Sequence, residues 1–78
     1  MGKETVIFYS SNLESHSYLV RKLEEVGLEV IPSLLSINSS HERSMNPSVR
    51  RLKGDNTYEG LMNVGRFIAY EEEKRLAS

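Results

Sequence analysis

The chain has 78 residues and a mass of 8.9 kDa, with 38% hydrophobic and 27% charged residues, which is typical of one small globular domain, residues 1–78. Ten basic and eleven acidic side chains give a formal net charge of −1, so bulk charge favours neither a nucleic-acid nor a membrane partner. Cysteine is absent, which excludes disulfides, cysteine-bound zinc and thiol-based catalysis. No apolar run reaches membrane-spanning length and no signal peptide is evident, so we expect a cytoplasmic protein.

The first part of the chain predicts a strand, a helix and a second strand. Residues 5–10 are β-branched or aromatic and nearly continuous, which is typical of a central strand buried on both faces beside a parallel neighbour. Ser11 and Glu14 have capping-box spacing, so we expect a helix that starts there and is ended by Gly27. The apolar side of this helix comprises His16, Leu19, Val20, Leu23 and Val26. A second extended segment follows, and Pro32 predicts that it lies at a sheet edge or breaks there.

The middle of the chain predicts a loop and a hairpin. Residues 38–47 are polar and are interpreted as a loop, and residues 48–52 form a weak strand pattern. The pair at 54–55, Gly-Asp, favours a type II′ turn that leads into a further strand at 57–58.

The last segment predicts a helix that begins near Gly60. We expect Leu61, Val64 and either Phe67 or Ile68 to face inward, and the residues from Glu71 onward to face water. Gly65 costs the helix about 1 kcal/mol relative to alanine, so we expect a close packing contact there.

The polar residues between the first strand and the first helix allow two interpretations. Ser11 and Ser15 either cap and shape the turn or, with the free N–H groups of a helix start, bind an anion. His16 and His41 have no partners at metal-ligand spacing, so we expect no metal site. The sequence has no Gly-x-Ser-x-Gly motif and no evident Ser/His/Asp set, so it predicts no catalytic residue.

A locally basic stretch also allows two interpretations. Its members are His41, Arg43, Arg50, Arg51 and Lys53. It is either a solvated hairpin or a patch for an acidic partner, a phosphate or single-stranded nucleic acid, with Tyr58 able to stack on a base. Because Arg50 and Arg51 are consecutive in a strand, their side chains must point to opposite faces. We therefore expect one of them to pack against the sheet and the other to project.

The order of these elements resembles the thioredoxin-like fold, and its glutaredoxin branch most closely. Three pieces carry the resemblance: residues 6–10 with the helix and strand that end at 30, the run Asn46-Pro47-Ser48-Val49, and residues 54–61. The resemblance implies an α/β fold with a four-stranded mixed sheet in the order 2-1-3-4, packed by two main helices. It also implies a cis peptide bond before Pro47.

The departures from that family concern its chemistry. The Cys-x-x-Cys motif of the family falls on Leu13-Glu14-Ser15-His16, so the resemblance implies a redox-inactive relative. The KaiB clock proteins and the small glutamate-rich glutaredoxin-like adaptors are similar in outline and also lack the thiols. The family's glutathione cleft would map to residues 11–16, 45–47 and 59–60. Met45 stands there in place of a threonine and Glu59 would repel a glutamyl carboxylate, which disfavours glutathione. We therefore expect no cofactor, with glutathione as the alternative.

The sequence as a whole predicts a redox-inactive, glutaredoxin-like binding or regulatory module that engages a protein partner. The alternative is an accessory protein that binds nucleic acid or phosphate, and an enzyme is the least favoured class. The candidate binding residues are Ser11, Ser15, His16, Asn46, Pro47, Arg50 and Arg51.

Overall fold

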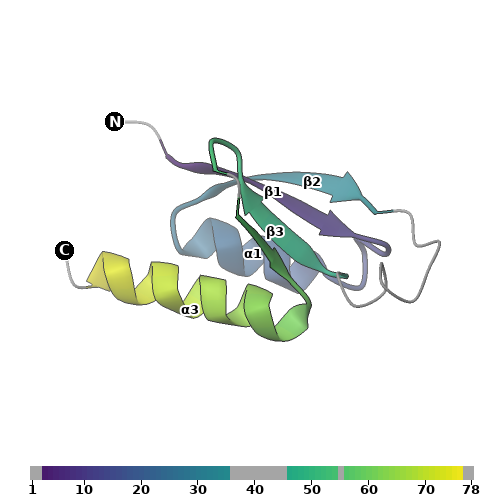
Figure 1. Cartoon of the computed structure of the whole chain (residues 1–78). Helices are drawn as coiled ribbons and strands as arrows, with labels where there is room; N and C mark the ends of the chain where they lie inside the picture. The colour runs from purple at the N-terminus through teal and green to yellow at the C-terminus, as the bar shows by residue number, and fades with distance from the viewer. Residues whose placement is uncertain (1–2, 36–45, 55, 77–78) are drawn as a thin grey trace.

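The computed structural model describes residues 3–35, 46–54 and 56–76 and contains a four-stranded mixed sheet with two helices against one face (Figure 1). In chain order the elements are β1 (Thr5–Ser10), α1 (Ser17–Glu25), β2 (Glu29–Leu34), β3 (Ser48–Arg51), β4 (Thr57–Glu59) and α3 (Leu61–Leu76). The strand order is β2-β1-β3-β4, with β1 parallel to β2 and antiparallel to β3, and β3 antiparallel to β4. The predicted α/β class, mixed sheet and strand order are therefore confirmed.

Strand β1 is central in the sheet, as predicted, but it is not equally buried on both faces. Val6, Phe8 and Ser10 are buried, whereas Ile7 and Tyr9 between them are half-buried. The reason is that α1 and α3 lie against the same face of the sheet (Figure 1). The core lies between that face and the two helices and is made of Val6, Phe8, Leu19, Leu23, Val26, Leu28, Val49, Val64, Phe67 and Ile68.

Helix α1 begins five residues later than the capping-box pattern predicts, since its N-cap is residue 16 and not residue 11. Ser11 does not cap it, because the Ser11 side chain bonds to Asn46 instead. The side-chain amide oxygen of Asn12 accepts the N–H of Ser15 at 3.1 Å and caps a turn ahead of the helix, whose own N-cap is His16.

The end of α1 at Gly27 is confirmed. Gly27 has φ of 96°, a conformation that side chains with a Cβ disfavour. Its N–H donates to the carbonyl of Glu24 at 3.0 Å, and the N–H of Leu28 donates to Leu23 at 3.2 Å, which closes the last turn. A Cβ at Gly27 would lie 3.0 Å from Nε of Arg75, so a larger residue would also require the Arg75 side chain to shift slightly.

The edge position of Pro32 is confirmed, because β2 is an outer strand of the sheet. The hairpin of β3 and β4 is confirmed as well, but its type II′ turn is wrong. The connection spans residues 52–56, the N–H of Gly54 donates to the carbonyl of Arg51 at 3.1 Å, and Gly54 does not have positive φ. A connection of this length does not need the tight turn of a two-residue loop.

Helix α3 departs from the predicted pattern at three positions. Leu61 is exposed, while Phe67 and Ile68 are both buried. Glu71, expected to face water, is fully buried. A Cβ added to Gly65 would meet nothing within 4 Å, so the predicted close contact there is wrong. Within the described segments, no helix combines the length and apolar character needed to cross a bilayer. The predicted loop, with His41 and Arg43, lies outside the described residues except for Asn46 and Pro47.

Candidate functional site

Three segments that are distant in sequence meet at the C-terminal end of β1. The N–H of Ser11 donates to Oδ1 of Asn46 at 2.9 Å, and Nδ2 of Asn46 donates back to Oγ of Ser11 at 2.8 Å. The carbonyl of Pro47 accepts the N–H of Gly60, just before α3, at 2.8 Å. The Asn46–Pro47 peptide bond is cis, as the sequence led us to expect. We call the area formed by Ser11, Ser15, His16, Asn46, Pro47 and Gly60 the proline surface.

A buried serine that the sequence analysis missed holds the turn of this surface. Oγ of Ser10 lies 2.5 Å from Nδ1 of His16 and accepts the N–H of Asn12 at 3.0 Å. The inward direction of Ser10 could have been found, because it continues the alternation of Val6 and Phe8 along β1. Ser10 is fully buried, so this serine–histidine pair positions the turn and cannot present a nucleophile to a substrate.

Several backbone N–H groups of the turn at residues 12–17 are already hydrogen-bonded within the turn. The N–H of Ser15 donates to the side chain of Asn12, the N–H of His16 to the Asn12 carbonyl, and the N–H of Ser17 to the carbonyl of Glu14. Because these donors are occupied, an anion at the start of α1 would find few of the free N–H groups that such sites require. The structure thus argues against an anion site at the start of α1 and shows Ser15 within the turn through its backbone N–H, while the Ser11 side chain bonds to Asn46 and caps nothing.

Exposed apolar side chains border the proline surface. Leu34 pairs in register with Ser10 at the end of β2 and is 72% exposed. Leu61 and Met62 directly follow Gly60, and Met62 is 70% exposed. Tyr18, in the first turn of α1, is also exposed. Exposed apolar side chains such as these offer area that contact with another macromolecule would remove from water.

Arg50 and Arg51 do not belong to the proline surface. Arg51 pairs with Val6 at the beginning of β1, so it lies at the opposite end of the strand from Ser10. Arg50 pairs with Ile7 and is on the other face of the sheet, where, among the described residues, its guanidinium makes one long contact of 3.5 Å to the carbonyl of Gly54. The predicted opposite orientation of the two arginines is therefore confirmed, and Arg51 is the packed member.

The Arg51 guanidinium lies in a cluster of charges around a buried carboxylate. It lies 5.0 Å from the ring centroid of Phe67, pairs with Glu4, and donates to Oε2 of Glu71 at 2.8 Å. Arg75 donates to Oε1 of Glu71 at 2.8 Å, and Nζ of Lys74 lies 4.0 Å from Oε2 of Glu71.

These contacts change the pKa values of Glu71 and Arg51. Burial alone would raise the pKa of Glu71, but hydrogen bonds from Arg51 and Arg75 and the nearby positive charges lower it below its ordinary value. Burial alone would lower the pKa of Arg51, whereas hydrogen bonds and charges of Glu4 and Glu71 raise it. Glu71 continues the inward stripe of Val64 and Ile68, so helical spacing signalled its position although its charge suggested the surface. This cluster is structural, since every member is held by another.

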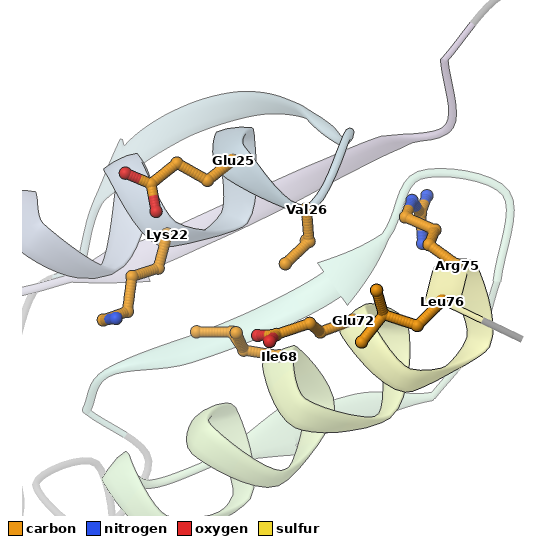
Figure 2. Close-up of a pocket in the computed structure, with 7 residues that line it drawn as sticks. All are labelled: Lys22, Glu25, Val26, Ile68, Glu72, Arg75 and Leu76. Atoms are coloured by element: carbon orange, nitrogen blue, oxygen red, sulfur yellow. The ribbon is translucent and has the colours of Figure 1, made fainter.

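A further hollow lies elsewhere, between the C-terminal part of α1 and α3. It measures about 370 Å³, and Figure 2 shows Lys22 and Val26 on α1 pointing toward Ile68 and Glu72 on α3. Its full lining is Lys22, Glu25, Val26, Ile68, Glu72, Arg75 and Leu76. Opposite charges are balanced around apolar groups, so this groove selects no ligand by charge.

Neither a metal site nor a relative identifies the function. Within residues 3–35, 46–54 and 56–76, no group of three or more histidine, aspartate or glutamate side chains is placed to hold a metal ion. Comparisons with protein-family models, curated proteins and solved structures gave no match for this chain. The function must therefore be inferred from the geometry of the chain itself.

Proposed function

We propose that the protein is a non-catalytic binding module of thioredoxin-like fold, related in outline to the glutaredoxin branch, that docks a protein partner on the proline surface. The fold assignment is supported by the β2-β1-β3-β4 order, by the parallel β1–α1–β2 unit and by the position of Pro47 before β3. The chain has no cysteine, so it cannot use that fold for thiol–disulfide exchange.

One observation carries the docking proposal: the polar atoms of the proline surface are bonded to one another while large apolar side chains around them stay exposed. The reciprocal hydrogen bonds of Ser11 and Asn46, and the bond from Gly60 to Pro47, fix three segments into one surface. A surface fixed in advance loses little conformational entropy on binding. Leu34, Leu61 and Met62 supply apolar area that a partner would remove from water.

The proposal excludes a catalytic role for the same residues. Ser10 is fully buried, and Ser11 is engaged with Asn46. His16 is turned with Nδ1 toward Ser10. None of these groups is both activated and accessible, which a nucleophile or a general base must be.

Site-specific photocrosslinking in cells tests the proposal. A benzophenone amino acid at position 15, exposed in the turn that belongs to the proline surface, should give a discrete protein adduct. The same group at position 21, exposed on α1, is the matched control and should give none. The adduct should disappear in the variant Met62→Glu. Equal labelling from positions 15 and 21, or none from position 15, would contradict docking on the proline surface.

The alternative, binding of phosphate or nucleic acid, is favoured by a different feature. Arg66, Tyr58 and Tyr70 line one pocket, which combines a cation with aromatic rings. Salt titration separates the two functions, because phosphate contacts weaken steeply with salt and apolar protein contacts do not.

A further inference from the structure

A pocket of about 340 Å³ lies between the hairpin and α3, and five residues line it: Arg51, Tyr58, Arg66, Phe67 and Tyr70. None of them is acidic and three are aromatic. Its volume is at the lower end of the range of about 300–1,000 Å³ that small-molecule sites occupy. The pocket lies beside the proline surface, because Tyr58 is two residues before Gly60 and Arg66 is one helical turn after Met62. Its far end at Tyr70 is nine residues, or about 13 Å, along α3 from Leu61.

The wall of the pocket is built from stacked side chains. The ring of Tyr58 packs on Phe67 with centroids 4.8 Å apart and the planes tilted by 45°. The guanidinium of Arg51 also lies over Phe67. These groups are held by the core and by the Glu71 cluster, so they form a rigid support.

The open side of the pocket presents one ring and one cation. Tyr70 is 59% exposed, and Arg66 precedes it by four residues, which places both on the same side of α3. Within the described part of the chain, Arg66 makes neither a hydrogen bond nor an ion pair. The charge of Arg51 is offset by Glu4 and Glu71, so Arg66 provides the uncompensated positive charge of this pocket.

We propose that this pocket binds a nucleobase that carries a phosphate, as in a nucleoside monophosphate. The base stacks on the exposed ring of Tyr70 beside Tyr58, and the phosphate pairs with the guanidinium of Arg66. Every nucleobase has a flat π-face that stacks on aromatic side chains, and guanidinium groups bond phosphate oxygens in pairs. The tyrosine rings are partly exposed, so a ring that stacks on them stays partly in water. This suits a polar nucleobase better than an apolar phenyl group. This site goes beyond the proposed protein docking and does not depend on it.

Titration of the ¹⁵N-labelled protein with adenosine 5′-monophosphate, adenosine and inorganic phosphate tests the assignment. The monophosphate should shift the amide signals of Tyr58, Arg66, Phe67 and Tyr70 and leave those of Ser11, Ser15 and His16 unchanged. It should bind at least tenfold more tightly than either adenosine or phosphate alone. Unchanged signals at the proline surface keep this result independent of the docking proposal.

Variants at exposed positions show which groups recognise the ligand. Arg66→Gln should weaken monophosphate binding about tenfold, or about 1.4 kcal/mol, and leave adenosine binding unchanged. Tyr70→Leu should weaken both ligands about tenfold. Arg21→Gln, which removes an exposed arginine from α1, is the matched control and should have no effect. Thermal melts of all three variants should equal that of the parent, because none of these side chains is buried.

Three results would overturn the proposal: no shift at the pocket residues, equal binding of adenosine and the monophosphate, or equal binding by Arg66→Gln and the parent. N-acetylphenylalanine, which combines a ring with a carboxylate, must also bind more weakly than the monophosphate, and equal or tighter binding would assign the pocket to a peptide end. An oligonucleotide of six adenosines then identifies the source of the nucleotide. Tighter binding with steep salt dependence indicates a nucleic acid, and equal binding indicates a free nucleotide.

Discussion

Replacing Arg51 with methionine should be strongly destabilising. Methionine preserves an unbranched stem over Phe67 but removes the guanidinium. Glu71 then stays fully buried with a side-chain hydrogen bond from Arg75 and with Lys74 4.0 Å away. Losing a charge-assisted hydrogen bond costs about 1.5–3 kcal/mol, and the exposed pair with Glu4 adds less than about 1 kcal/mol. The remaining bond from Arg75 keeps the cost below the roughly 3–5 kcal/mol of a fully broken buried pair.

We therefore expect Arg51→Met to lower the free energy of unfolding by about 2–4 kcal/mol, a large part of the roughly 4–12 kcal/mol typical of a domain of this size. The melting temperature should fall by about 10–25 °C. Urea unfolding followed by circular dichroism measures the change.

Arg50→Met is the matched control, because among the described residues Arg50 makes one long contact, to Gly54, on the other face of the sheet. We expect it to change stability by less than about 0.5 kcal/mol. A double-mutant cycle with Glu71→Gln should give a coupling energy of at least about 1 kcal/mol between positions 51 and 71. Equal stabilities of Arg51→Met and Arg50→Met would refute the role of the cluster.

Four further predictions follow from particular residues. The lowered pKa of Glu71 contributes stability above the ordinary glutamate pKa of about 4.3, and that stability is lost as the pH falls through the lowered value. Melting temperatures measured between about pH 5 and pH 2 should therefore fall more steeply for the parent than for Glu71→Gln; parallel curves would contradict this. Gly65→Ala should raise the free energy of unfolding by about 0.5–1 kcal/mol in urea titrations because its Cβ meets open space, whereas Gly60→Ala should lower it because φ there is 88°; stabilisation by both would contradict this. Asn46→Ala, which breaks both bonds to Ser11, should cost about 1–3 kcal/mol in the same titrations, and Asn63→Ala, which loses one exposed bond to Glu59, should cost less than about 0.5 kcal/mol; equal costs would argue against a fixed proline surface. The protein should not reduce a mixed disulfide in the presence of glutathione, and turnover above the buffer rate that survives repurification would contradict a thiol-free scaffold.

Local patterns predicted most of the fold. The continuous apolar run of β1 marks a central strand, Gly27 ends α1, and Pro32 places β2 at an edge. Each of these signals lies within a few residues of the element that it specifies. The combination of a parallel unit with a later hairpin then leaves few strand orders, and the predicted one is found.

The missed features depend on partners far away in the chain. Ser11 was predicted to cap α1, but its side chain bonds to Asn46, 35 residues later. Glu71 was predicted to face water because of its charge, yet Arg51, 20 residues earlier, makes its burial possible. The grouping of Arg66 with Tyr58 and Tyr70 also requires β4 to lie beside α3, which no local pattern gives.

The most direct test of docking on the proline surface uses the partner that crosslinking at position 15 identifies. The affinity of that partner is measured for two variants of α3. Met62→Glu places a charge beside Gly60, and Leu76→Glu makes the same change at an equally exposed position at the other end of the helix. We predict that Met62→Glu weakens binding at least about 30-fold, as expected for a central apolar contact, while Leu76→Glu leaves it unchanged. Equal affinities of the two variants, or a dissociation constant that rises steeply with salt for the parent, would contradict a protein-docking function for this surface.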